Sequence, residues 1–455
     1  MKKFLSLLDG ASLVALVVAM CSQVDVRSVG RDTLAEGLGY ATKTLSIALS
    51  DVVFLLVTLY FVARVVQMRA WKRLWWPPLP CFALLFVLVL SALHSSSIGS
   101  AVAASIAENG FGPRAFLVKE SKEAIAEIIQ WSAYFLVAPW IFVNLLHDRR
   151  DGFSSRRNLA LGAFVFATMA SGIAALSQLQ SFSQSAPHGF FIGSPNIYGA
   201  FLALALPLIL EQESDDLKTQ GRYWILSLVL VFIALSTVIS IWAIVAMGIG
   251  FVVAVLARRG GVKLKAFRLS LVAALALVTL GFWRFPEALA PFRAESTRIS
   301  SDSQKVKKQY VEWQAALGWS VPRERAFATG VGPGNYQLNI GPYYNALPNE
   351  EKMPPDSNNL WLVQAVSIGV LGLGALLWVV LHFWALAWRA AKQFPADWLG
   401  AGVCAALSSW IFVNGFHALI VRGAGLVLAF LFALAVIASQ GERNADEAAT
   451  VSNSL

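Results

Sequence analysis

Three glycines and two arginines form the stretch of this sequence best suited to chemistry. Gly330, Gly332 and Gly334 alternate with other residues in FATGVGPGNYQ, and Arg323 and Arg325 come just before them. Glycine tolerates positive φ, so successive N–H groups can point into one concavity and bind an anion. The arginines would add charged donors for phosphate oxygens. The pattern indicates either a phosphate site or a tight turn that returns the chain to the next helix.

The same stretch lacks the features of two common nucleotide-binding motifs. It has no Gly-Lys-Ser/Thr ending, and its glycines are spaced differently from those of a dinucleotide fingerprint, which also follows a strand. Cys21, Cys81 and Cys404 lie in or beside apolar stretches, and no His or Cys residues show metal-ligand spacing. We therefore expect no cofactor, no bound metal and no disulfide.

The composition decides which kind of protein must position these residues. Of 455 residues, 57% are hydrophobic and only 14% are charged, and the mean hydropathy is +0.62. Soluble globular domains carry about 25% charged residues and are less apolar. The chain is therefore expected to be a polytopic membrane protein. Its uninterrupted apolar stretches indicate helices rather than the strands of a barrel.

About twelve stretches approach the roughly twenty apolar residues that a membrane-spanning helix requires. They lie at 5–23, 46–67, 77–96, 124–146, 158–178, 196–211, 222–240, 241–257, 268–285, 359–386, 398–418 and 424–440. The predicted fold is an all-α membrane protein with helices over 1–285, a periplasmic loop over 286–358, helices over 359–440 and a tail over 441–455. The division of the run 222–257 into two helices matters most, because a single helix there would move every later loop to the other side.

Lysine and arginine gather in alternate short loops, and this predicts the orientation. With Met1 in the cytoplasm, the inner loops carry Lys2, Lys3, Arg64, Arg69, Lys72, Arg73, Arg149, Arg150, Arg156, Arg157, Arg258, Arg259, Lys263, Lys265 and Arg268. Both termini are then cytoplasmic. Positive residues in inner loops set the topology and contact anionic lipid, and this explains the net charge of +9. The charge therefore does not indicate nucleic-acid binding.

The long loop over 286–358 would form a cationic lobe on the outer face, since long loops cross the membrane regardless of charge. Within it, residues 301–320 have the apolar spacing of an amphipathic helix, with Trp313 at headgroup level. Arg293 and Arg298 precede this helix. They could clamp a diphosphate or bind lipid headgroups.

Three sequence stretches resemble the O-antigen ligase and polysaccharide polymerase superfamily. GVGPGNYQ follows a Trp-containing helix, and DSNNLWLVQAVSIGVLGLGALL (356–377) comes about 20 residues later. An earlier stretch, GFFIGSPNIYGAFLALALPLIL (189–210), is similar to the Pro-Asn segment that opens a mid-chain helix in that family. The plan of twelve helices with one large late periplasmic loop matches as well.

The resemblance implies an enzyme of the bacterial inner membrane. Such enzymes take a glycan from undecaprenyl diphosphate on the periplasmic face and pass it either to lipid A core or to another lipid-linked repeat unit. They are thought to need no metal and no nucleotide, and the polymerases usually work with a flippase and a chain-length regulator. The chemical demand is to stabilise charge on the leaving diphosphate and to supply a base for the acceptor hydroxyl.

The predicted site assigns residues of this sequence to catalysis and to substrate binding. The catalytic candidates are Asp356, Arg323 and Arg325, and the substrate-binding candidates are Gly330, Gly332, Gly334, Asn335, Arg293, Arg298, Asn358, Asn359 and Arg422. Arg422 is the only charge in the short outer turn between the last two helices, on the same predicted side as the glycine loop, and snorkelling to the interface explains it about as well as a role in the site.

Two departures from the family pattern leave the activity open. The family commonly has a Ser-Arg-Gly-like motif where this chain reads SIWA (240–243), and a His before the Asn where this chain reads DSNN (356–359). Asp356 could act as the base, the chain could be a polymerase rather than a ligase, or it could be a catalytically weakened paralogue. We favour the polymerase, because the missing His is associated with ligase activity.

Two further interpretations do not require glycan transfer. A secondary transporter could gather an anionic solute with its cationic lobe, but such proteins usually have internal repeats and ionisable residues near the membrane midplane, and this chain has no convincing repeat and few charges deep in its spans. A non-catalytic scaffold of a polysaccharide assembly complex is the third interpretation. Glu120, Glu123 and Glu127 are explained by pairing with neighbouring lysines on an exposed helix start. The alternative, a carboxylate pair for acid–base chemistry, has no further support in the sequence.

Overall fold

The structure is a computed structural model that describes most of the helical segments of the chain. The described residues are 2–22, 25–29, 45–68, 71, 74–116, 118–146, 153–179, 187–191, 195–210, 217–238, 240–257, 316, 324–345, 359–394, 398–416 and 423–440. The predicted span at 268–285, the tail at 441–455 and nearly all of the predicted loop before residue 324 lie outside these ranges.

Each predicted span other than 268–285 coincides with a helix. The helices are α1 (Lys2–Met20), α2 (Leu49–Met68), α3 (Leu79–His94), α5 (Lys119–Ser132) continuing into α6 (Ala138–Leu146), α7 (Phe153–Gln178), α8 (Pro195–Leu210), α9 (Leu217–Thr237), α10 (Ile241–Ala257), α16 (Leu360–Gln393), α17 (Trp398–Val413) and α18 (Gly423–Ser439). The predicted division of 222–257 is confirmed, because α9 ends at Thr237 and α10 begins at Ile241.

By length and apolar composition, four stretches of the described chain could each cross a membrane. They are Leu49–Met68, Lys119–Leu146, Arg156–Gln178 and Leu360–Gln393, and the bent pair of α3 with α4 (Ser96–Asn109) would make a fifth. Other apolar helices, such as α8, α17 and α18, are shorter than a full span. The chain is therefore a helical membrane protein, and the total of twelve spans stays a prediction.

A short sheet departs from the all-helical prediction. Strands β1 (Asp25–Val29) and β2 (Leu45–Ala48) pair antiparallel, and Arg27 lies opposite Ile47. The second predicted span was expected to begin at residue 46, but β2 occupies its first residues and α2 starts at Leu49. At that junction the side chain of Asp51 accepts a hydrogen bond of 3.1 Å from the N–H of Ala48.

The span at 119–146 contains one π-helical turn, η4 (Ala133–Val137), between α5 and α6. Pro139, two residues after this turn, has no N–H to donate to the preceding turn of a regular helix. A π-turn is one of the ways in which a helix accommodates such a disruption. Trp131 before the irregular turn and Tyr134 and Phe135 within it are all buried, so the helix stays packed through the turn.

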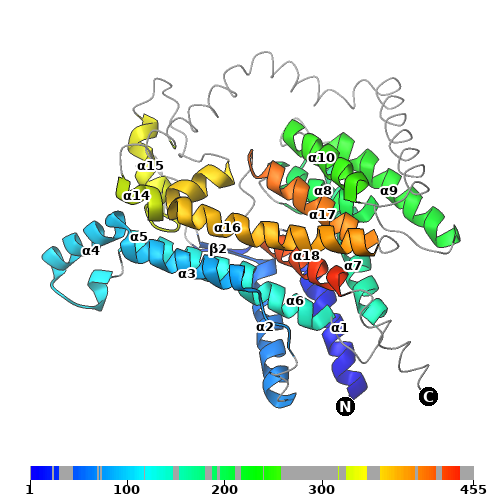
Figure 1. Cartoon of the computed structure of the whole chain (residues 1–455), viewed down its shortest axis with the longest axis horizontal. Helices are drawn as coiled ribbons and strands as arrows, with labels where there is room; N and C mark the ends of the chain where they lie inside the picture. The colour runs from blue at the N-terminus through cyan, green and yellow to red at the C-terminus, as the bar shows by residue number, and fades with distance from the viewer. Residues whose placement is uncertain are drawn as a thin grey trace.

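The buried centre of the protein is formed by its last helices. The long helix α16 packs against α3, α17 and α18, and α17 also packs against α8 and α10 (Figure 1). Nearly every side chain of α18 is buried, including the aromatic pair Phe430 and Phe432. Phe432 stacks on Phe383 of α16 with ring centroids 4.2 Å apart.

Large apolar side chains cover the outside of the peripheral helices. Leu55, Leu56 and Leu59 of α2 and Phe86 of α3 are well exposed in the isolated chain. Soluble monomers rarely expose such continuous apolar surface. These faces are suited to contact with lipid acyl chains, in agreement with the expectation from the composition.

Candidate functional site at the glycine loop

The glycine loop, residues 330–334, connects two short helices. Helix α14 (Glu324–Thr329) precedes it and α15 (Tyr336–Asn345) follows it. The φ angles of Gly330, Gly332 and Gly334 are 74°, 104° and 71°, so all three adopt the positive values expected from the sequence. L-residues with side chains rarely adopt these values, and the loop therefore depends on glycine at each of the three positions.

The loop packs against a break inside α16. Gly369 has φ 69° and ψ −175°, which divides α16 into two helical parts. The carbonyls of Val366 and Ser367 end the first part, where a helix has no N–H groups of its own to satisfy them. The N–H groups of Val331 and Gly332 donate to these two carbonyls over 3.0 and 2.9 Å. The loop therefore completes the hydrogen bonding of a broken helix.

A second broken helix holds the loop from the other side. Helices α3 and α4 meet at Ser95 with a bend of 45°. The Ser95 hydroxyl accepts from the N–H of Ile98 and caps α4, and it donates to the carbonyl of Val331. One turn earlier, the Ser91 hydroxyl donates to the carbonyl of Thr329 over 2.5 Å. Two serines beside one helix break thus bind the carbonyls on either side of Gly330, at the start of the loop.

Asn335 anchors the far end of the loop. Its side chain is fully buried, and its Nδ2 donates to the carbonyls of Glu120 in α5 and of Pro333 over 3.1 and 3.2 Å. Because both contacts are to acceptors, the amide must point its nitrogen toward them. The Oδ1 atom is consequently fixed on the other side, and it is buried without a hydrogen-bond partner.

Helix α5 brings a carboxylate to the same place. A side chain on Gly334 would lie 2.7 Å from the carbonyl oxygen of Glu123 and 3.1 Å from Oε2 of Glu127. Oε1 of Glu127 lies 3.5 Å from Nε2 of Gln364, which is buried in α16. Pairing with lysines on an exposed helix start was the favoured explanation of Glu127, but this residue is partly buried and faces the glycine loop.

Three oxygen atoms around the loop are buried without a hydrogen-bond partner. They are Oδ1 of Asn335, Oε1 of Gln364 and Oγ of Ser367, and each of these side chains is at most 3% exposed. A buried polar atom left unpaired costs about 1 to 3 kcal/mol, so such atoms are rare unless a water or ligand satisfies them. The two amide oxygens can only accept hydrogen bonds, so the group that satisfies them must donate.

The predicted anion nest is altered by these contacts. The N–H groups of Val331 and Gly332 bind the carbonyls of α16, and the N–H of Asn335 donates to the carbonyl of Gly332 over 3.2 Å. These three groups therefore point into the protein and not toward a diphosphate. The contribution of Gly330, Gly332 and Gly334 to substrate binding stays a prediction, and packing already accounts for all three glycines.

Asn359 has a structural role. Its side chain accepts a hydrogen bond of 3.2 Å from the N–H of Leu362 and so caps the start of α16. The N–H of Leu360 donates to the carbonyl of Asn414 at the end of α17, which fixes this start against its neighbour. Capping explains an Asn here without any contact to substrate.

The structure describes half of the twelve predicted site residues, and for one of them, Arg325, it describes the main chain only. Gly330, Gly332, Gly334 and Asn335 are brought together in the loop, and Asn359 begins the helix against which the loop packs. Arg325 belongs to α14, but its side chain is outside the described part of the structure. The remaining candidates lie outside the described residues: Arg293, Arg298, Arg323, Asp356, Asn358 and Arg422.

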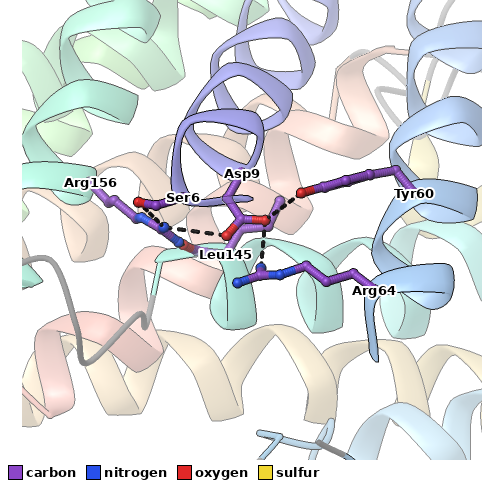
Figure 2. Close-up of polar contacts among 6 residues, drawn as sticks. All are labelled: Ser6, Asp9, Tyr60, Arg64, Leu145 and Arg156. Carbon is purple, nitrogen blue, oxygen red and sulfur yellow. Dashed lines mark hydrogen bonds and ion pairs between the residues drawn. The ribbon is translucent and has the colours of Figure 1, made fainter. Parts of the chain in front are cut away.

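A separate buried ionic cluster joins α1, α2 and α7 (Figure 2). Asp9 is fully buried in α1 and lies 2.5 Å from Nη1 of Arg64 and 3.3 Å from Nη2 of Arg156. The hydroxyl of Tyr60 donates to Asp9 over 2.9 Å, and Arg156 also donates to the carbonyl of Leu145. Arg64 and Arg156 were expected to be topological charges in loops, and this is wrong for both, because Arg64 lies within α2 and Arg156 is buried within α7.

The two polar clusters lie at opposite ends of the predicted topology. The ends of helices predicted to face the cytoplasm meet at Asp9, and the ends predicted to face outward meet at the glycine loop. In Figure 1, α14 and α15 lie at the same end of the protein as α4 and the start of α5. The helix ends that were predicted to lie on the same side of the membrane are therefore also close together in the structure. Which of the two sides faces the cytoplasm stays a prediction.

Sequence reasoning missed Glu127, Gln364 and Asp9 as members of polar clusters. Gln364 and Asp9 each interrupt an apolar helix, and an isolated polar residue in a span is a known signal of an internal contact. Glu127 carried no such signal, since it follows a charged helix start. Within the described part of the chain, no three His, Cys, Asp or Glu side chains are grouped closely enough to hold a metal ion.

The fold and the site together define a helical membrane protein in which two broken helices enclose a glycine loop. Comparison with known proteins adds no family to this description. No protein family model matches the chain, and no curated protein is significantly similar to it.

Proposed function

We propose that this protein transfers a glycan from undecaprenyl diphosphate to a glycan acceptor on the periplasmic face of the bacterial inner membrane. Polymerisation of lipid-linked repeat units is the favoured reaction, and ligation to lipid A core is the alternative. The proposal rests on the resemblance of GVGPGNYQ and of the stretch that opens α16 to the ligase and polymerase superfamily.

One structural observation supports the proposal more than any other. The two stretches that carry the late resemblance, the glycine loop and the start of α16, pack directly on one another through the hydrogen bonds of Val331 and Gly332. Buried oxygens without partners lie at this contact. A ligand site between these stretches would use residues from both, as an enzyme site of this kind requires.

The chemistry needs a group that stabilises the leaving diphosphate and a group that takes the acceptor proton. Arg323 and Arg325 immediately precede the loop in sequence and are the candidates for the diphosphate oxygens. Asp356 is the candidate base from sequence. Because Gly330, Gly332 and Gly334 are needed for packing, substitutions at the two arginines test the proposal more cleanly than substitutions at the glycines.

The first experiment is to delete the gene from its host and to separate the cell-envelope glycans on a gel. Strains restored with the wild type, with Asp356→Ala, or with Arg323→Gln and Arg325→Gln together, are compared with the deletion. Single-repeat glycans in the deletion would support a polymerase. Full-length chains that remain on the lipid carrier would support a ligase. Unchanged glycans in the deletion would refute glycan transfer.

Membrane levels of each variant, measured by immunoblot, separate loss of chemistry from loss of folding. Lys307→Gln and Lys308→Gln provide a matched control, because they remove two positive charges from the same predicted lobe without touching the arginines before the loop. The control should restore wild-type glycans. The double arginine variant should accumulate at normal levels but leave the glycans as they are in the deletion.

A secondary transporter is the second candidate, and the broken helices favour it. The α3 and α4 pair bends by 45° and α16 is interrupted at Gly369. Interrupted helices often surround the substrate site of transporters. If the deletion leaves the glycans unchanged, uptake of labelled anionic solutes into the deletion and wild-type cells is the next measurement.

A further inference from the structure

An aromatic stack joins the start of α10 to the end of α17. The indole ring of Trp242 lies nearly parallel to the ring of Phe416, with ring centroids 3.8 Å apart and an interplanar angle of 6°. Phe412 packs against the same Phe416 with ring centroids 5.3 Å apart. Trp242 is therefore the end member of a row of three rings. It is exposed, whereas the two phenylalanines are half-buried.

The two stacked rings are positioned by hydrogen bonds within their own segments. At the start of α10, the N–H of Ala243 donates to the hydroxyl of Ser240 over 3.4 Å, which caps the helical turn that carries Trp242. After the end of α17, the N–H of Phe416 donates to the carbonyl of Val413 over 3.0 Å in a tight turn. The backbone thus fixes where each ring begins, and the stack fixes the plane of the indole.

Trp242 presents one ring face and its N–H to the surroundings. The residue is 36% exposed, and because Phe416 covers one face of the indole, the exposed area lies on the opposite face and the rim. Within the described chain, the indole N–H of Trp242 makes no hydrogen bond. By contrast, the indole N–H of Trp361 donates to the carbonyl of Ile411 over 3.2 Å. Trp361 is tied to the protein, whereas Trp242 keeps its donor for a ligand.

A flat ring with one open face and an available donor suits a sugar. The π-face of an indole carries partial negative charge and attracts the C–H groups that cover one face of a pyranose ring. The indole N–H can donate to a hydroxyl oxygen at the rim of the same sugar. A diphosphate fits less well, because its negative charge would be repelled by the π-face.

The stack lies beside the start of α16. Helix α17 packs against both α10 and α16 (Figure 1). The carbonyl of Asn414, two residues before Phe416, accepts a hydrogen bond of 2.9 Å from the N–H of Leu360, the first residue of α16. Val366, in the same part of α16, binds the glycine loop. The exposed indole is thus connected through short backbone contacts to the stretches on which the proposed function rests.

We propose that Trp242, held in place by Phe416, binds one sugar ring of the glycan beside the transfer site. The C–H face of the sugar lies on the indole, and a sugar hydroxyl accepts from Nε1. This inference rests on the proposed function. No bond forms or breaks at Trp242, so its loss weakens the binding of the glycan and leaves the transfer step itself in place.

A tryptophan at a helix end can also anchor a helix at the lipid headgroups, and Trp76 is the matched control for that role. Trp76 is 53% exposed and stacks on Trp140 with ring centroids 5.7 Å apart. This pair lies at helix ends predicted to face the cytoplasm, whereas Trp242 lies at an end predicted to face the periplasm. Anchoring would apply to both tryptophans, but binding of a periplasmic glycan would apply to Trp242 alone.

The test measures binding to the purified full-length protein in detergent by a saturation-transfer NMR titration. The probe is the repeat-unit oligosaccharide, released by limited acid hydrolysis from the envelope glycan that the deletion strain loses or shortens. Trp242→Leu keeps an apolar side chain against Phe416 but has neither a planar face nor an N–H. We expect its Kd to rise by about tenfold or more, and that of Trp76→Leu to change by at most about twofold.

The results separate failure of this inference from failure of the proposed function. Equal affinity of the wild type and Trp242→Leu would refute the sugar site while glycan transfer stands. Equal weakening in Trp242→Leu and Trp76→Leu, with equally lowered melting temperatures, would assign both residues to anchoring and also refute it. If the deletion changes no glycan, the proposed function fails and the inference fails with it.

Should Trp242→Leu be absent from the membrane, Trp242→Phe decides in its place. This variant keeps an aromatic ring against Phe416 but removes the N–H and part of the open face. We expect its Kd to rise by about threefold. An unchanged Kd at normal membrane level would refute the binding of a sugar hydroxyl by the indole.

Discussion

The N–H of Val331 donates a hydrogen bond of 3.0 Å to the carbonyl of Val366, and this bond joins the glycine loop to the interrupted turn of α16. The two backbones come so close that a side chain on Gly330 would overlap the carbonyl of Ser367, and one on Gly369 would overlap the carbonyl of Ala328. Glycine is therefore required on both sides of the contact, for space as well as for positive φ.

Alanine at either glycine of this contact should destabilise the protein. For Gly330→Ala or Gly369→Ala we expect a loss of about 2 kcal/mol or more, because positive φ alone costs an L-residue about 1 to 2 kcal/mol and the overlap adds to it. Thermal unfolding of the purified protein in detergent measures the change. Gly374→Ala, in the same helix, is the control, since its Cβ would meet nothing within 4 Å. Equal melting temperatures for Gly369→Ala and Gly374→Ala would contradict the close contact.

Removal of the Ser95 hydroxyl should loosen the loop without unfolding the protein. Ser95→Ala removes both the cap of α4 and the donor to the carbonyl of Val331. We expect a loss of about 1 to 3 kcal/mol, concentrated in the loop. Hydrogen exchange of the Val331 and Gly332 amides should become faster by at least tenfold. Ser100→Ala, whose exposed hydroxyl binds only the carbonyl of Ser97 in its own helix, should leave these amides unchanged.

The helices could be predicted from the sequence because a long apolar run by itself indicates a segment that is buried or in contact with lipid. The boundary between α9 and α10 was found in the same way, although the run 222–257 is apolar on both sides of it. The span predicted at 77–96 ends at the break at Ser95, but helix α4 beyond this break was not predicted, and the break at Gly369 was not found. A glycine inside an apolar run is compatible with a continuous helix, and only the partner that satisfies the freed carbonyls makes the break favourable.

The glycine loop illustrates how far the candidate site could be predicted. Positive φ and close approach at Gly330, Gly332 and Gly334 were expected, and both are found. The direction of the N–H groups was not predictable, because it depends on carbonyls of α16 that are remote in sequence. The approach of Glu127 to Gly334 has the same origin: periodicity within α5 explains the helix but not which loop it meets.

Gly250 should be essential for the packing of three helices. A side chain there would lie 2.8 Å from Cγ of Pro207 in α8 and would collide with the hydroxyl of Ser409 in α17. That hydroxyl donates to the carbonyl of Ala246 in α10 over 2.8 Å, so the collision would also break a hydrogen bond between helices. Small residues at such positions allow close helix contact in membranes.

Gly250→Ala should therefore cost about 1 to 3 kcal/mol, as overpacking of a well-packed interior commonly does. Unfolding in increasing SDS reports the change. Gly248→Ala lies in the same helix and meets nothing within 4 Å, so it should unfold like the wild type. A Gly250→Ala protein as stable as Gly248→Ala would mean that α8, α10 and α17 do not pack as described.

The carboxylate of Asp9 should stabilise the protein through both arginines that contact it. Asp9 is fully buried, and Asp9→Asn would remove the negative charge between Arg64 and Arg156 (Figure 2). Loss of one member of a buried ionic group typically costs about 3 to 5 kcal/mol, because the remaining charge stays buried. Unfolding in SDS should show this loss for Asp9→Asn, while Glu108→Gln, at an exposed position of α4, should show none.

A double-mutant cycle then identifies the contact responsible. If the attraction between Asp9 and Arg64 carries the effect, Asp9→Asn combined with Arg64→Gln should cost less than the sum of the two single changes, by about 0.5 to 3 kcal/mol. The loss of stability in the double variant is smaller than the sum because Arg64→Gln removes a positive charge that Asp9→Asn has already left without its carboxylate. Additive costs would show that Asp9 acts instead through Arg156 and Tyr60, whose contacts with it the Arg64 substitution leaves in place.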